Sequence, residues 1–90
     1  MKVVRQTLAG TSTSFDFTAK GCKYLVKNNT DGDILVNFEA ITQDNEATSI
    51  KIPKGTAQVV FTDDVYPQYF DKVYAKGTGE VEVQQLCIWG

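Results

Sequence analysis

Short runs of alternating apolar and polar residues, separated by turn-forming residues, extend along most of this 90-residue chain. The run at residues 34–38 is the plainest, because Ile34, Val36 and Phe38 occupy every second position. In an extended strand successive side chains point to opposite faces, so this spacing places the apolar side chains on one face. No segment repeats apolar residues at the helical spacing over three turns. The sequence therefore predicts an all-β fold.

Eight segments show the strand pattern, and polar or glycine-containing stretches separate them. They are residues 3–8, 15–17, 24–28, 34–38, 49–52, 56–61, 72–76 and 80–89. About eight short strands joined by tight turns favour an antiparallel β-sandwich or jelly roll, with a small β-barrel as the alternative. Since no linker or internal repeat divides the chain, residues 1–90 are predicted to form a single domain.

Two local features of the predicted strands can be tested against a structure. In residues 80–89 the two valines before position 84 have one parity, whereas Leu86 and Ile88 have the other. One extra residue would restore the facing of the strand, so we predict a β-bulge at Gln84–Gln85. We also predict that residues 3–8 form an edge strand, because edge strands need blocking or pairing and a terminal strand is readily left at an edge.

The segment between the strands predicted at 24–28 and 34–38 contains possible oxygen ligands at alternate positions, namely Asn29, Asp31 and Asp33. Calcium takes six to eight oxygens, and the distal glutamate of an EF-type loop is missing at the required spacing. Asn, Asp and Gly are also the residues of a tight turn, where an Asp-Gly pair tolerates positive φ. We interpret this segment as the turn of a β-hairpin, and a calcium-stabilised loop is the alternative.

Catalytic chemistry has few candidates in this chain. The chain contains no histidine, which removes the usual general base near neutral pH and the commonest transition-metal ligand. The glycines at 77 and 79 are not followed by the helix and lysine of a phosphate-binding loop. We therefore expect a protein that is not an enzyme and has no cofactor.

Charge and hydropathy also exclude two classes of partner. Nine basic and eleven acidic residues give a formal net charge of −2, and the basic residues are dispersed, whereas phosphate binding uses clustered Lys and Arg. No apolar run approaches the length of a membrane span or of a signal peptide. We expect neither nucleic acid nor a membrane as partner, and synthesis in the cytoplasm. In that reducing compartment Cys22 and Cys87 are expected to be free thiols, with a disulfide between them as the alternative.

Aromatic residues are the candidates for a binding surface. Tyr66, Tyr69 and Phe70 lie in a predicted loop, and Trp89 is the penultimate residue. In one interpretation Phe70 and a tyrosine close one end of the core, and Trp89 completes the last strand. In the other, these four side chains form an exposed cluster that contacts another subunit or stacks against a sugar. Both interpretations remain open from the sequence.

Three segments of the chain, taken together, carry a resemblance to a known group of proteins. They are GCKYLVKNNTDGDI at 21–34, IKIP at 50–53 and GEVEVQ at 79–84. The chain resembles small virion-associated proteins of tailed bacteriophages and of prophages of Gram-positive hosts. The resemblance extends over residues 15–89. It implies a β-sandwich or jelly-roll module that decorates, joins or projects from the particle, and it transfers no functional residue. It also implies location in the virion, and in the host cytoplasm during assembly.

The sequence therefore leads to two functional hypotheses. The first is a non-enzymatic bacteriophage structural protein that forms homo-oligomers and contacts other virion proteins. The alternative is a carbohydrate-binding β-module, on a receptor-binding appendage, which would use the same aromatic residues as a stacking platform. The bulge, the edge strand and the aromatic residues give three places where a structure can test this reasoning.

Overall fold

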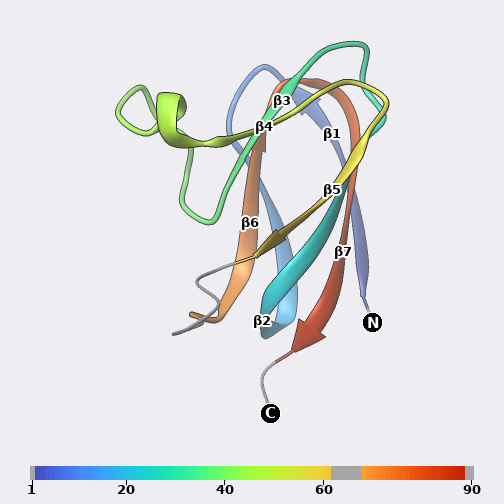
Figure 1. Cartoon of the computed structure of the whole chain (residues 1–90), viewed down its shortest axis with the longest axis vertical. Helices are drawn as coiled ribbons and strands as arrows, with labels where there is room; N and C mark the ends of the chain where they lie inside the picture. The colour runs from blue at the N-terminus through green and yellow to red at the C-terminus, as the bar shows by residue number, and fades with distance from the viewer. Residues whose placement is uncertain (1, 62–67, 89–90) are drawn as a thin grey trace.

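The computed structural model describes residues 2–61 and 68–88, which form antiparallel β-strands and one short 3-10 helix (Figure 1). The elements are β1 (Val3–Ala9), β2 (Thr13–Asn28), β3 (Ile34–Asn37), η1 (Glu46–Thr48), β4 (Ile50–Ile52), β5 (Ala57–Phe61), β6 (Phe70–Lys76) and β7 (Thr78–Ile88). The prediction of an all-β, antiparallel fold of sandwich or barrel type is confirmed. No helix in these two ranges is long and apolar enough to cross a membrane.

Strand β2 is long enough to belong to two halves of one sheet. Its first part pairs with β6, and its second part pairs with β7 on one side and β5 on the other. The full order is β1-β7-β2-β6-β3-β4, with β5 paired to β2 off this path. We call β1, β7, β5 and the second part of β2 the β5 half-sheet. The β6 half-sheet is made of the first part of β2 with β6, β3 and β4 (Figure 1).

One apolar core lies between the two half-sheets. Each strand contributes side chains from alternate positions, as expected when only one face of a strand is buried. The core residues are Leu8, Phe15, Phe17, Tyr24, Val26, Ile34, Val36, Ile52, Val60, Val73, Ala75, Val81 and Val83. Burial of apolar surface, at about 25 cal/mol per Å², is the main force that holds the half-sheets together.

The two strands predicted at 15–17 and 24–28 are one strand, so the described residues contain seven strands where eight were predicted. Gly21 lies in the glycine-containing stretch that was predicted to separate these two strands, but it is buried inside β2. The pairing register of β2 shifts between Asp16 and Gly21, and again beside Cys22. Irregularities of this kind bend a strand without ending it, which lets β2 pass from one half-sheet to the other.

The predicted bulge in β7 is present but lies beyond Gln84–Gln85, so its predicted position is wrong. Tyr24 pairs with Gln85, whereas the residue before Tyr24 in β2 pairs with Cys87. Leu86 is therefore the extra residue on β7, and its side chain is 37% exposed. The inward-facing series of β7 consequently continues to position 85 before the register shifts.

The bulge lies after Gln85 because the polar side chain of this residue still points toward the core. It is buried, and its amide nitrogen donates hydrogen bonds to the hydroxyl oxygen of Tyr24 at 3.1 Å and to the backbone oxygen of Ala19 at 2.8 Å. A buried polar group is stable when it is hydrogen-bonded in this way. The parity of the apolar residues alone does not show that a polar side chain continues the inward-facing series of β7.

The segment between β2 and β3 is not the turn of a hairpin, so that prediction is also wrong. Within the described part of the chain β2 pairs with β5, β6 and β7, whereas β3 pairs with β4 and β6. The segment instead crosses between the half-sheets. Gly32 does not adopt the positive φ that an Asp-Gly hairpin turn uses.

The side chain of Asn28 shapes this crossing segment. It is 1% exposed, and its amide nitrogen donates to the backbone oxygens of Gly32 at 2.9 Å and Ile52 at 3.0 Å. Its side-chain oxygen accepts from the backbone N–H of Thr30 at 2.9 Å and from the hydroxyl of the same residue at 2.6 Å. Since both donors and both acceptor positions of the amide are used, Asn28 joins the end of β2 to the crossing segment and to β4.

Three strands lie at edges of the sheet in the ranges that the structure describes. Strand β1 pairs with β7 alone, so the predicted edge strand at residues 3–8 is confirmed. Strand β4 pairs with β3 alone, and β5 pairs with β2 alone. The last two edges were not predicted, because the sequence does not show which strands are neighbours.

Candidate functional site

Exposed large apolar side chains gather on the β5 half-sheet. Among the described residues, Val3, Val59, Phe61 and Leu86 are 41%, 42%, 48% and 37% exposed. They belong to β1, β5 and β7, and none of them comes from the β6 half-sheet. The core residues Leu8 of β1, Val60 of β5, and Val81 and Val83 of β7 have the opposite parity in their strands, so the exposed side chains lie on the outer face. With the half-buried Leu25 of β2, we call this set the outer apolar face.

The strand register brings three residues of the outer apolar face into one row. Val3 pairs with Gln84, Gln84 pairs with Leu25, and Leu25 pairs with Val59. Directly opposite residues of neighbouring antiparallel strands have Cβ atoms about 5 Å apart, so side chains in such a row touch their neighbours. The row therefore crosses all four strands, and one amide side chain interrupts its apolar surface.

A charged row, made of Arg5, Glu82 and Lys27, runs beside the apolar row on the same face. The carboxylate of Glu82 accepts a hydrogen bond from Arg5 Nε at 2.7 Å and lies 3.1 Å from Lys27 Nζ. The Glu82 side chain is 12% exposed, whereas those of Arg5 and Lys27 extend into solvent. The hydrogen bond from Lys27, together with that from Arg5, lowers the pKa of the Glu82 carboxyl from its ordinary value. The acid is thus held ionised between two cations.

Replacing Glu82 with glutamine is expected to destabilise the protein at neutral pH and to have no effect in strong acid. Because the folded-state pKa of Glu82 is lowered, its contribution is complete above the unfolded-state value near 4.5 and is lost as the pH falls through the folded-state pKa. Urea-unfolding midpoints of wild type and Glu82→Gln between pH 7 and pH 2 measure this loss. Glu80→Gln, an exposed acid at the same parity of β7, is the control. A difference that persists unchanged to pH 2 contradicts the ion-pair explanation.

Of the four aromatic residues predicted to form a binding surface, the structure places two. Tyr69 and Phe70 are half-buried at the start of β6, whereas Tyr66 and Trp89 lie outside the described residues. The Phe70 ring stacks on Phe38, with ring centroids 5.2 Å apart and ring planes 20° apart.

These rings continue an aromatic series that begins in the core. The ring of Phe38 lies 5.9 Å from that of Tyr24, which lies 5.1 Å from that of Phe17. The Tyr24 hydroxyl also donates a hydrogen bond to the backbone oxygen of Phe70. Phe70 therefore covers one end of the core, which fits the first interpretation given to it.

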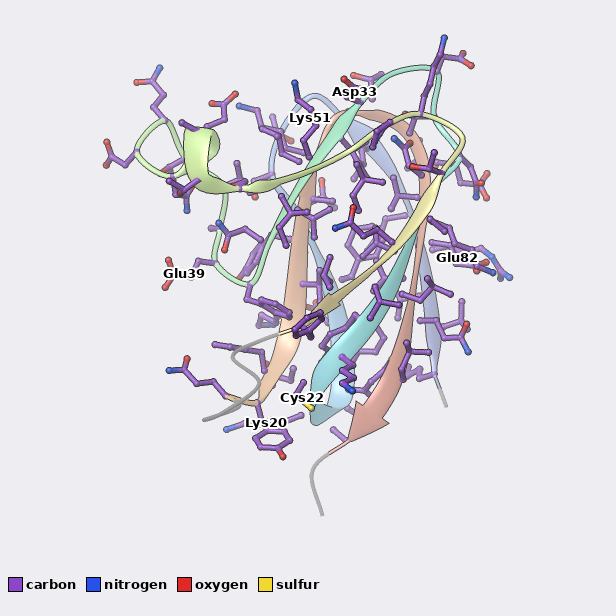
Figure 2. The ribbon with its side chains drawn as sticks, in the orientation of Figure 1. Lys20, Cys22, Asp33, Glu39, Lys51 and Glu82 are labelled. Carbon is purple, nitrogen blue, oxygen red and sulfur yellow. The ribbon has the colours of Figure 1, made fainter. Side chains whose placement is uncertain are left out.

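An open groove of about 600 Å³ lies beside β3, β4 and η1. Its lining residues are Asp33, Ile34, Leu35, Gln43, Glu46, Ala47, Ser49 and Lys51. The charged side chains there already have partners, because Lys51 lies 4.0 Å from Asp33 (Figure 2) and Glu46 lies 3.5 Å from Lys76. None of the lining residues is aromatic, and no buried side-chain nitrogen or oxygen among the described residues lacks a hydrogen-bond partner. The groove thus offers no stacking platform, and its charged side chains already form ion pairs.

The two acids of the alternative calcium loop are not part of a larger cluster. Residues 2–61 and 68–88 contain no group of three or more His, Cys, Asp or Glu side chains that could hold a metal ion. Asp33 lies 4.0 Å from Lys51, and the shape of the crossing segment follows from the Asn28 hydrogen bonds. The described residues therefore provide a structural reason for this segment that does not involve a metal.

The structure describes the side chain of one of the two cysteines. Cys22 is buried at the bend of β2, near one end of the molecule (Figure 2). The next residue, Lys23, pairs with Cys87, so the two cysteine positions lie in neighbouring strands. The side chain of Cys87 is outside the described part of the structure, and the free-thiol state stays a prediction.

The residues of the outer apolar face were not singled out from the sequence. A signal was present, since apolar residues of the strand predicted at 56–61 occupy both parities, with Val60 at one and Val59 and Phe61 at the other. Only one parity can face the core, so one of these sets has to be outside. Which set is outside depends on the pairing of β5 with β2, which the pattern does not reveal.

No known protein family, curated protein sequence or solved structure matches the chain. Function therefore has to be inferred from the physical properties of its own residues. The outer apolar face is the described feature that the core does not explain, because these side chains are exposed while the core is already filled by others.

Proposed function

We propose that this protein is a non-enzymatic structural component of a bacteriophage particle, and that it acts through protein–protein contacts. The observation that carries this proposal is the concentration of exposed apolar side chains on one face of the β5 half-sheet. Single exposed apolar residues are normal on a soluble protein, but a contiguous apolar patch with a polar rim marks an interaction surface. Resemblance of residues 21–34, 50–53 and 79–84 to virion-associated phage proteins supports the particle assignment.

The arrangement of this face suits docking to another protein. Its apolar row lies beside the row in which Glu82 neutralises part of the charge of Arg5 and Lys27. Interfaces commonly combine an apolar centre with a polar, solvent-accessible rim. The four paired strands also hold the row rigid, so little conformational entropy is lost when a partner binds. Copies of this chain and other virion proteins are the proposed partners, in the virion and during assembly in the host cytoplasm.

Carbohydrate binding has less support than assembly within the described residues. A sugar platform needs exposed rings next to polar groups that can orient the sugar hydroxyls. The groove beside η1 has the polar groups but no ring, and Phe70 is stacked on Phe38. Phe61 is an exposed ring directly opposite Lys23, but no second exposed ring accompanies it among the described residues. These features favour contact with a protein surface.

Charged substitutions on the outer apolar face are expected to weaken assembly without unfolding the domain. We expect wild-type protein to have a mass above that of one chain in size-exclusion chromatography with light scattering at micromolar concentration. The variants Val3→Lys and Leu86→Lys should raise the dissociation constant about tenfold, because a buried charge replaces apolar contact area. Thr7→Lys, at an exposed position of β1 on the same face, is the control. A wild-type protein that is monomeric at every concentration and binds no head, neck or tail component would overturn the proposal.

A further inference from the structure

Strand β5 is the least protected edge of the sheet. In the described residues it pairs with β2 alone, so one side of β5 is open. Its five residues, Ala57–Phe61, contain no charge and no proline. Soluble proteins usually block an open edge with charges, proline, a bulge or a very short strand, because the unpaired backbone groups of an edge attract another strand.

The other two edges carry such protection. Strand β1 contains Arg5, whose side chain is 66% exposed. Strand β4 has only three residues, with the exposed Lys51 at its centre, and Pro53 follows it directly. Of the three edge strands, β5 alone lacks a charged residue, a proline and a very short length. Its open edge therefore suits pairing with another strand.

Hydrogen bonding fixes which backbone groups of β5 face the open side. The backbone N–H of Asn28 donates to the backbone oxygen of Thr56 at 2.9 Å, so position 56 is directed toward β2. Hydrogen bonding alternates along an antiparallel strand, so Gln58 and Val60 also direct their backbone groups toward β2. Val59 and the residues at 57 and 61 consequently direct their N–H and C=O groups away from β2.

We propose that β5 pairs antiparallel with β5 of a second copy of this chain, about a twofold axis that passes between the two Val59 residues. In this register Val59 faces Val59 of the second copy, and Ala57 faces Phe61 of the second copy. The small side chain at 57 leaves room for the large ring at 61. This inference rests on the proposed function, because it names the partner that completes the outer apolar face.

A second copy fits this edge because the strand is complementary to itself. An interface about a twofold axis uses the same surface on both subunits, so each residue must tolerate its symmetry-related opposite. Strand β5 meets this requirement, since it places no like charges against each other and pairs large with small side chains. The pairing also joins the row of Val3, Leu25 and Val59 to the same row of the second copy, which gives one strip across eight strands that is apolar except for the Gln84 amide of each copy.

Disulfide trapping tests the register directly. Residues that face each other as a hydrogen-bonded antiparallel pair have Cα atoms about 5.5 Å apart, within the range that a disulfide spans. We expect mild oxidation of Val59→Cys to give a covalent dimer on a non-reducing gel, in most of the protein. Wild type shows the background from the native cysteines, and Thr7→Cys places an exposed cysteine on the β1 edge. Equal cross-linking of Thr7→Cys and Val59→Cys would overturn the β5 pairing.

A second variant tests the same pairing without cysteine chemistry. Val59→Lys sets two lysines against each other at the twofold axis, and we expect the dimer dissociation constant to rise about tenfold or more. Val59 is 42% exposed, so lysine at this position leaves the core intact. An unchanged circular-dichroism spectrum would show this.

The results separate failure of this inference from failure of the proposed function. If wild type self-associates but Val59→Lys has the same mass and Val59→Cys gives no covalent dimer, β5 pairing is wrong. The outer apolar face then still assembles by another contact, which Val3→Lys and Leu86→Lys disrupt. If wild type is a monomer that binds particle components, β5 pairing alone is overturned. If wild type neither self-associates nor binds particle components, both the β5 pairing and the proposed function are overturned.

Discussion

Replacing Asn28 with alanine is expected to lower the free energy of unfolding by about 3 kcal/mol. The substitution removes the side-chain partners of the Thr30 N–H and of the Ile52 oxygen, and it removes one of the two donors to the Gly32 oxygen, which keeps the Thr30 hydroxyl at 2.7 Å. Each buried polar group left without a hydrogen bond costs about 1–3 kcal/mol, and partial access of water to the loop limits the total. Urea unfolding followed by circular dichroism measures the change.

Two further variants make the Asn28 result specific. Asn29→Ala alters the exposed neighbour, whose backbone N–H bonds to the Glu80 oxygen at 3.1 Å and is retained in alanine, so a change within about 0.5 kcal/mol is expected. Asn28→Asp keeps the acceptor that Thr30 uses but loses both donors and adds a buried charge, so it should destabilise at least as much as alanine at neutral pH. If Asn28→Ala and Asn29→Ala unfold at the same urea concentration, the hydrogen-bond network does not stabilise the fold.

The elements that the sequence predicted are those whose signal is local. Alternation at Ile34 and Val36 identified β3, because the period of two belongs to the strand itself. A tight turn was also expected between the strands predicted at 49–52 and 56–61, and it forms with Gly55 at φ +70 and the Thr56 N–H bonded to the Pro53 oxygen. In both cases the residues that specify the geometry are adjacent in sequence, so no knowledge of strand pairing was needed.

The predictions that failed depend on contacts between distant residues. The segment that follows Asn28 was predicted to be a hairpin turn, but the Asn28 side chain that shapes it also bonds to Ile52, which is 24 positions away. The bulge was predicted at Gln84–Gln85, but Gln85 faces inward, where its partners Ala19 and Tyr24 are more than 60 positions earlier. Gly21 lies in the stretch that was predicted to separate two strands, but it is part of the bend within the single strand β2. A polar residue or a glycine can occupy a buried strand position only when a distant segment satisfies it, and a local pattern does not reveal that segment.

The same limit applies to the candidate site. Aromatic composition directed attention to Tyr69 and Phe70, which the structure places half-buried at the start of β6. The outer apolar face is made of ordinary valines, leucines and one phenylalanine, and only the register across β1, β7, β2 and β5 brings them together. Apolar residues with conflicting parity, such as Val59 and Val60, were the one local sign that a strand had an apolar outer face.

Replacing Gly79 with alanine is expected to lower the free energy of unfolding by about 3 kcal/mol, for two reasons that add. Gly79 has φ +123, a backbone conformation that residues with a side chain rarely adopt. A Cβ atom at this position would also lie 2.9 Å from both Cβ and Cγ2 of Thr30 and 3.3 Å from its Cα. Thr30 cannot withdraw easily, because its N–H and hydroxyl are both bonded to the Asn28 side chain. Thermal or urea unfolding measures the loss.

Glycine controls separate the two reasons. Gly55→Ala introduces a side chain at φ +70 with nothing within 4 Å, so it reports the backbone cost of the left-handed region without a steric contact, about 1 kcal/mol. In the double variant Gly79→Ala with Thr30→Ser, one of the two closest carbons is removed and the hydroxyl is kept. The double variant should therefore lose less free energy of unfolding than the sum of the losses of Gly79→Ala and Thr30→Ser. If Gly79→Ala is no more destabilising than Gly55→Ala, the close approach of β7 to Thr30 does not constrain position 79, and the tight contact between β7 and the crossing segment is not required for stability.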